Sequence, residues 1–175
     1  MFSIIIPTYN NLEYLKLCLK SIKKNSKFNH EIIVHVNEGT DGTLNYLKSL
    51  DHKITYSAIN SGVCVAFNEA AKRSSKDYIV LAHDDMYFCP RWDEVFYKEL
   101  EQIPVNSDFF LSGTMVQPFE SYINLNCGKN IDEFDENKLL NELPKIRFKD
   151  FQGTHWQPSL IPVSYTHLTL PTMFE

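Results

Sequence analysis

Hydrophobic residues gather in short, nearly continuous runs along the first two thirds of the chain. Runs of this kind, rich in β-branched residues and bounded by turn residues, are typical of strands buried in a sheet. Pro7 ends the first of them, and the run at residues 78–82 is apolar throughout, which predicts burial on both faces. The predicted strands lie at residues 3–6, 31–36, 53–58, 78–82 and 109–116.

Between these runs the apolar residues recur at the spacing of a helix. The first predicted helix begins with a capping box, in which Asn10 is the N-cap and Glu13 lies three residues on. Strands that alternate with helices predict right-handed βαβ units, and hence an α/β fold with a Rossmann-like, mostly parallel sheet flanked by helices. The predicted helices lie at residues 12–22, 44–50, 63–70, 91–102 and 136–143.

The regular alternation stops after about residue 117, and the end of the chain differs in composition. Residues 151–174 contain no Lys, Arg, Asp or Glu, and three prolines exclude one long helix there. Residues 163–172 resemble a non-native tail that recurs at the ends of translated environmental reads. We therefore expect one domain at residues 1–161, incomplete on its C-terminal side, and a non-native or disordered tail at 162–175. The alternative is a genuine short C-terminal extension.

Composition and charge narrow the functional classes. The chain has 175 residues, of which 43% are hydrophobic and 22% charged, and its formal net charge is −5. Scattered lysines argue against a nucleic-acid partner. Four cysteines without a Cys-x-x-Cys pair are typical of free thiols in a reducing compartment. Neither a signal peptide nor a transmembrane segment is evident, so we expect a cytoplasmic protein or one peripheral to the inner face of the membrane.

Polar residues follow each of the first four predicted strands. In open parallel sheets, ligands bind beyond the carboxyl ends of the strands, so these residues predict a binding edge. They are the segments Pro7–Asn10, Asn37–Asp41, Asn60 with Gly62 and Asn68, and His83–Asp85.

The acidic pair Asp84-Asp85 is the most informative of these segments. Two adjacent carboxylates at the end of a buried strand repel each other unless a cation or a set of donors compensates. Mg²⁺ and Mn²⁺ prefer such hard oxygen ligands, and in phosphate sites they take one or two carboxylates together with phosphate oxygens. The alternative is that the pair begins a turn, where Asp is common.

Four motifs in the same order resemble family 2 glycosyltransferases with the GT-A fold. They are Ser3–Asn10, Glu31–Val34 with its glycine turn, Asn60-x-Gly62-x5-Asn68, and the strand that ends in Asp84-Asp85. The resemblance covers residues 1–116, and more weakly residues up to 161.

The resemblance implies inverting transfer from a nucleoside-diphosphate sugar, often a UDP-sugar, to a glycan or lipid-linked acceptor, as in polysaccharide biosynthesis. It also implies a divalent metal, Mn²⁺ or Mg²⁺, on Asp84 and Asp85, with Asp85 favoured as the direct ligand. The residues that it places at the nucleotide are Pro7, Thr8 and Tyr9 at the base, Glu38 at the base or ribose, and Asn60, Gly62, Asn68 and Asp84 around it.

Two departures from the family pattern leave parts of the site open. Asn37-Glu38 stands where the family has an acidic pair, which leaves base selectivity undefined. His83 stands where the acidic motif begins with another Asp; it is either a partner of the metal site or a core-edge histidine.

The catalytic base stays unassigned, because the Gly-Gly-Phe-Asp-like stretch that precedes it in the family is absent. Glu120 and Asp150 are candidates only. Trp156 either stacks on a sugar ring or packs in the core.

The residues after the strands also bear on three other functions. A sugar-nucleotidyltransferase and a dinucleotide-dependent oxidoreductase both need a Gly-rich loop after a strand, which Pro7–Asn10 does not supply. A sugar-nucleotide-binding module without turnover remains open.

Overall fold

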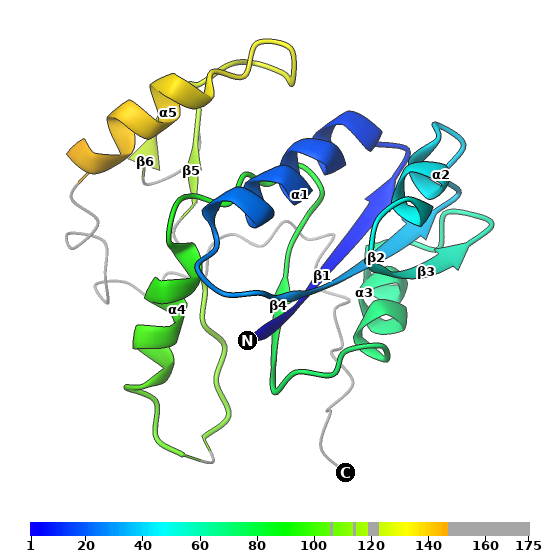
Figure 1. Cartoon of the computed structure of the whole chain (residues 1–175), viewed down its shortest axis with the longest axis horizontal. Coiled ribbons are helices and arrows are strands. Elements are labelled where there is room, and N and C mark those ends of the chain that lie inside the picture. Colours follow the sequence, from blue (N-terminus) through cyan, green and yellow to red (C-terminus); the bar gives the residue numbers. More distant parts are fainter. Residues whose placement is uncertain (106, 114, 119–122, 147–175) are drawn as a thin grey trace. The chain divides into compact units, whose positions relative to one another are not determined.

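The computed structural model describes residues 1–105, 107–113, 115–118 and 123–146 (Figure 1). The described residues form two compact units, residues 1–105 and residues 107–146, and each is described by itself.

The first unit is built on a four-stranded sheet in the order β3-β2-β1-β4, and every pairing in it is parallel. Four helices connect or follow the strands, so the predicted α/β fold with a parallel sheet is confirmed. The strands are β1 (Phe2–Tyr9), β2 (Glu31–Asn37), β3 (Lys53–Ser57) and β4 (Tyr78–Leu81). The helices are α1 (Leu12–Asn25), α2 (Thr43–Lys48), α3 (Val63–Ala71) and α4 (Trp92–Leu100).

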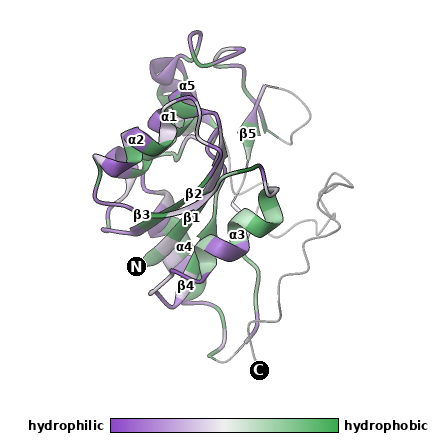
Figure 2. Ribbon diagram, turned by 90° about the vertical axis from the view of Figure 1, so that its right-hand side faces the viewer, coloured by the Kyte–Doolittle hydropathy of each residue, from purple (hydrophilic) through white to green (hydrophobic). Residues whose placement is uncertain are grey.

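Side chains of successive strand residues enter two different cores, because they point alternately to the two faces of the sheet. On one face Ile4 and Val34 pack with Leu15 and Leu19 of α1. On the other face the strands pack against α3. Figure 2 shows α1 and α2 on one side of the strands and α3 on the other. The residues of this second core are Ile5, Ile33, Phe67 and Ala70.

β1 continues past Pro7 to Tyr9, so the prediction that Pro7 ends this strand was wrong. The backbone amide of Ala82 donates to the carbonyl of Ile5, which shows that odd-numbered residues of β1 turn their backbone groups toward β4. Pairing with β4 stops at Ile5. Pro7 therefore lies where no ladder bond needs its missing N–H, the position at which a sheet tolerates proline.

The predicted capping box of α1 was also wrong. The N-cap is Asn11 rather than Asn10, and its side chain makes no capping bond. The first amide of the helix, that of Leu12, instead donates to Oδ2 of Asp41 at 2.8 Å. Asp41 lies in the loop after β2, so a contact distant in sequence replaces the local cap.

The second unit contains short elements, and the predicted strand at 109–116 was wrong. Among the described residues of that segment, only Val116 is in a strand, β5 (Val116–Gln117), which pairs with β6 (Ile123–Asn124). Phe110 is 72% exposed, as expected of an apolar segment without a partner strand. The helix predicted near 136–143 is confirmed as α5 (Glu136–Glu142), followed by the 3-10 turn η1 (Leu143–Lys145).

Among the described residues, no helix has the length and apolar character needed to cross a membrane.

Candidate functional site

A cavity of ≈ 290 Å³ lies at the carboxyl ends of the strands in the first unit. From β1 the chain builds the sheet outward through β2 and β3, and then crosses to the other side of β1 to form β4. Ligands in open α/β sheets bind at such a switch point, which here lies between β1 and β4. The cavity is lined by Pro7, Thr8, Tyr9, Asn11, Asn37, Asn60, Gly62, Val63, His83 and Asp84.

Asp84 brings a half-buried carboxylate to this cavity. Its Oδ1 accepts a hydrogen bond from Nδ2 of Asn11 at 3.0 Å. Burial and the charge of Asp85 raise the pKa of the Asp84 carboxyl, although the Thr8 hydroxyl, the Asn11 amide and His83 act in the opposite direction. The donors around Asp84 therefore do not fully compensate its negative charge, and a cation would.

The side chains present fit a divalent metal only if a phosphate group shares it. Within the described part of the chain, no cluster of three or more His, Cys, Asp or Glu could hold a metal ion. Asp84 and its exposed neighbour Asp85 supply two carboxylates. One or two carboxylates are the usual protein contribution where Mg²⁺ also binds substrate phosphates and waters.

Asn37 and the loop after β3 form the opposite wall. Asn37 is 3% exposed, and its Oδ1 accepts from both the backbone amide and the hydroxyl of Ser61, at 3.0 and 2.9 Å. Gly62, at φ 81°, takes a backbone conformation that favours glycine, and its amide donates to Oδ1 of Asn60 at 3.0 Å. This wall is therefore fixed by bonds to the end of β2.

The loops after β1 and β2 are also joined to each other. Oδ1 of Asn10 accepts from the amide of Thr40 at 2.8 Å. Asp41 accepts from Leu12 and from the amide of Thr43, at the starts of α1 and α2. Burial alone would raise the pKa of the Asp41 carboxyl, but these donors outweigh it and the pKa is lowered. The edge of the sheet is thus a connected surface rather than a set of independent loops.

Comparison with known proteins assigns the chain to a family. The sequence model described as Glycosyl transferase family 2 matches residues 3–168. The chain belongs to glycosyl transferase family 2.

Named relatives of this family 2 chain are glycosyltransferases. It is 34% identical over 122 residues to the uncharacterized glycosyltransferase YwdF of Bacillus subtilis, which covers 67% of this chain and 43% of that protein. It is 36% identical over 173 residues to an uncharacterized glycosyltransferase of Rickettsia felis, covering 95% of this chain and 28% of that one. Chondroitin synthase of Pasteurella multocida is 26% identical over 160 residues, which cover 89% of this chain and 16% of that protein. The family 2 chain thus spans less than half the length of these relatives.

Solved structures support the fold. S. aureus TarS 1-349 superposes with a TM-score of 0.53 at 21% identity, covering 65% of this chain and 39% of that one. The same protein in complex with UDP gives a TM-score of 0.53 at 23% identity, covering 65% and 38%. The fold of this family 2 chain is GT-A.

Six of the residues predicted at the nucleotide lie together in the family 2 site. Glu38 is adjacent, since its Oε1 accepts from the amide of Asn60 at 3.3 Å. Asn68, in α3, and Asp85 are not among the cavity-lining residues. Glu120, Asp150 and Trp156 lie outside the described residues, as does the predicted tail at 162–175. The six are Pro7, Thr8, Tyr9, Asn60, Gly62 and Asp84.

Sequence reasoning did not assign two of the lining residues, Asn11 and Val63, to the binding edge. Asn11 directly follows the first motif, so its position was a signal, but its bond to Asp84 spans a long stretch of chain. Asn37 and His83 were predicted at the binding edge, and both were also noted as departures from the family pattern. Val63 is the first residue of α3, and the sequence analysis placed it only in the helix predicted at 63–70.

Proposed function

We propose that this family 2 domain binds a nucleoside-diphosphate sugar, with UDP as its nucleotide, and transfers the sugar with inversion to an acceptor hydroxyl. The acceptor is a glycan or a lipid-linked glycan, and the protein works in the cytoplasm or at the inner face of the membrane. The observation that carries the proposal is the half-buried, incompletely compensated carboxylate of Asp84 at the switch point of the sheet.

The residues of the cavity have separate parts in this proposal. Tyr9, which is 48% exposed, offers a ring at the rim on which a base can stack. Glu38 offers a carboxylate that can accept from the base or the ribose. Gly62 leaves the backbone free of side-chain atoms at the start of α3.

Asp84 and Asp85 would hold Mn²⁺ or Mg²⁺ together with the diphosphate. When bound, the metal supplies positive charge to the leaving nucleoside diphosphate. Asn11 holds Asp84 in place through its 3.0 Å bond. The acceptor hydroxyl must also lose a proton, which calls for a base. Asp84 is the only carboxylate among the described residues that line the cavity, so we assign no base there.

A calorimetric titration tests the donor part of the proposal. The chain is titrated with UDP, GDP, CDP and ADP, each with Mn²⁺ and with a chelator in its place. We expect UDP to bind, and binding to weaken at least about tenfold without metal. No binding of any nucleotide, or equal binding in the chelator, would contradict the proposal. The Asp77→Asn variant, altered at an exposed acid away from the cavity, should behave as the parent.

The second candidate function is a sugar-nucleotide-binding module without turnover. It is favoured by the lack of a second cavity-lining carboxylate among the described residues. Incubation with UDP-sugars and a panel of glycan acceptors separates the two functions. Metal-dependent binding without product would favour the binding module, and product with inverted anomeric configuration would favour the transferase.

A further inference from the structure

A buried histidine lies behind the cavity, on the face of the sheet that α3 covers. His35 of β2 is 1% exposed, and Ile33 on the same face packs with Phe67 of α3. The two ring nitrogens of His35 contact two hydroxyls of the neighbouring strand β3. Nδ1 lies 2.8 Å from Oγ1 of Thr55, and Nε2 lies 3.1 Å from Oγ of Ser57. Both nitrogens are thus paired, which a buried imidazole requires.

A chain of polar contacts leads from this histidine to the cavity wall. The Ser61 hydroxyl donates to Oδ1 of Asn37 at 2.9 Å, and its oxygen lies 3.4 Å from Oγ of Ser57, whose hydroxyl can donate to it. The Ser61 backbone amide donates to the same Oδ1. Asn37 lines the cavity, and Ser61 stands between Asn60 and Gly62, which also line it. The loop that closes one side of the cavity is therefore attached to the sheet through residues that contact His35.

The charge state of His35 suits this arrangement. Burial lowers the pKa of the imidazole, while the Asn37 side chain and the charge of Glu69 on α3 act in the opposite direction. The ring is therefore neutral at neutral pH, with one donor and one acceptor nitrogen. The hydroxyls of Thr55 and Ser57 can each donate or accept, so they match either tautomer.

We propose that His35 is a positioning residue for nucleotide binding, which orders the loop Asn60–Gly62 and the Asn37 side chain through Ser57 and Ser61. This inference rests on the proposed nucleotide site, but its first step, the ordering of the loop, can be measured without any nucleotide. Preformed loops bind more tightly because less conformational freedom is lost on binding.

The control is the second buried histidine of the first unit. His30 has both nitrogens paired as well, with the amide of Phe2 at 3.2 Å and Oδ2 of Asp93 at 3.0 Å. These partners lie at the amino ends of the strands, away from the cavity. His30→Gln and His35→Val both alter a buried imidazole, and only the second acts on the loop.

Amide hydrogen exchange of the nucleotide-free chain measures the loop. In His35→Val we expect the amide of Ser61 to exchange about tenfold faster relative to amides of β1, because its acceptor, Oδ1 of Asn37, is no longer held. His30→Gln should leave that ratio unchanged. Unchanged protection of Ser61 in His35→Val would overturn the inference, whether or not the chain binds a nucleotide.

Calorimetry with UDP and Mn²⁺ then measures the consequence. We expect about a tenfold rise in Kd for His35→Val and for Ser61→Ala, and recovery to within about threefold for His35→Gln, whose amide can bond to both hydroxyls. His30→Gln should keep the parental Kd. If the parent binds and His35→Val binds equally well, the positioning role is refuted. If the parent binds no nucleotide, the proposed function fails instead. The exchange data still show whether His35 orders the loop Asn60–Gly62.

Discussion

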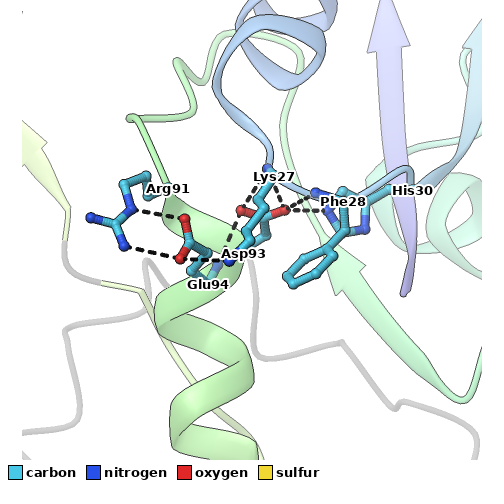
Figure 3. A network of polar contacts seen from close by, with 6 residues as sticks. All are labelled: Lys27, Phe28, His30, Arg91, Asp93 and Glu94. Atoms are coloured by element: carbon cyan, nitrogen blue, oxygen red, sulfur yellow. Dashed lines mark hydrogen bonds and ion pairs between the residues drawn. The ribbon is translucent and has the colours of Figure 1, made fainter.

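Asp93 and Asp84 carry carboxylates at opposite ends of the same sheet, the first buried and the second half-buried. The hydrogen-bond donors around the two carboxylates differ. Asp93, at the start of α4, is fully buried and faces the amino ends of the strands. Its oxygens accept from the amides of Lys27 and Phe28, both at 2.9 Å, and from Nε2 of His30 at 3.0 Å (Figure 3). Burial acts to raise the pKa of Asp93, but these donors outweigh it and the pKa is lowered.

Asp84 shows the opposite balance at the carboxyl ends of the strands. Asn11 donates to it, yet burial and the charge of Asp85 keep its pKa raised. Two carboxylates of the same residue type thus differ in how far neighbouring donors compensate them. The compensated one ties α4 to the loop before β2. The uncompensated one is suited to bind a cation that the protein itself does not supply.

His30 is one of the donors that compensate Asp93. Nδ1 of His30 accepts from the amide of Phe2, so the ring proton is on Nε2 and is donated to Asp93. Outside this pair, Glu94 bonds to Nε of Arg91 at 2.8 Å and to Nζ of Lys27 at 3.3 Å. Exposed ion pairs of this kind contribute little, so the stabilisation here comes from the buried pair and its backbone donors.

The largest effect is expected from Asp93→Asn. The new amide would place a donor against the N–H groups of Lys27 and Phe28, and we expect a loss of about 3–5 kcal/mol in the free energy of unfolding. Urea denaturation measures it. Asp77→Asn, at an exposed acid, should change this free energy by less than about 0.5 kcal/mol. Equal stability of the two variants would remove the contrast drawn above.

Asp84→Asn should weaken nucleotide binding and leave the free energy of unfolding intact, the reverse of Asp93→Asn. We expect nucleotide affinity with Mn²⁺ to fall about 100-fold, since the charge that holds the metal is lost. The free energy of unfolding at pH 7 should stay equal or rise slightly, because a carboxylate with a raised pKa opposes folding when it is ionised. Calorimetry and urea denaturation of the same preparation give both values. A clear loss of stability with intact binding would exchange the roles of the two acids.

The pH dependence of stability should separate the two ends of the sheet. The pKa of His30 is lowered from 6.5 in the fold, so the unfolded chain takes up the proton first. The stabilisation from neutral His30 is therefore complete above pH 6.5 and is lost as the pH falls toward the folded pKa. The stabilisation from ionised Asp93 is present above pH 3.8 and is lost as the pH falls through the lowered pKa of Asp93. The pKa of Asp84 is raised in the fold, so its contribution to stability is present at low pH and is lost as the pH rises through that raised pKa.

Urea denaturation from pH 7 to pH 5 tests the His30 contribution. His35 and His52 also have lowered pKa values, so the quantity to follow is the difference between the parent and His30→Gln. This difference should shrink as the pH falls. A difference independent of pH would mean that folding does not lower the pKa of His30.

The smallest effect is expected from Asn11→Ala, which removes the amide that donates to Asp84. Nucleotide affinity with Mn²⁺ should weaken about three- to tenfold, because Asp84 loses its placement and its pKa rises further. The pH at which binding is half lost should move upward in a calorimetric series. Glu13→Gln, in the first turn of the same helix, alters a side chain that pairs with Lys16 and does not line the cavity, so it is the matched control and should bind as the parent does.

The parallel sheet and the polar residues that line a cavity at its carboxyl edge could be predicted from the sequence, because both depend on short-range patterns. The apolar run at 31–36 forms β2, which is largely buried. The run at 78–82 forms β4 as predicted, but its predicted burial on both faces was wrong, because Tyr78 and Leu81 are 39% and 36% exposed. Asp84 follows directly on one of these strands, so its place at the carboxyl edge followed from the strand itself. The run at 109–116 was apolar too, but a strand also needs a partner, which the local pattern does not contain.

The tertiary structure alone decided which donors surround each polar group. Nothing near Asp93 in sequence shows that Lys27, Phe28 and His30 will donate to it, nor does the sequence near His35 show its connection to Ser61. Asp41, rather than the adjacent Asn10, caps α1 for the same reason. Hydrophobic periodicity acts over a few residues, whereas the compensation of a buried charge depends on groups that the fold brings from distant segments. The sequence therefore determined where the acids lie along the sheet, and the fold determined which of them is compensated and which is left to bind a ligand.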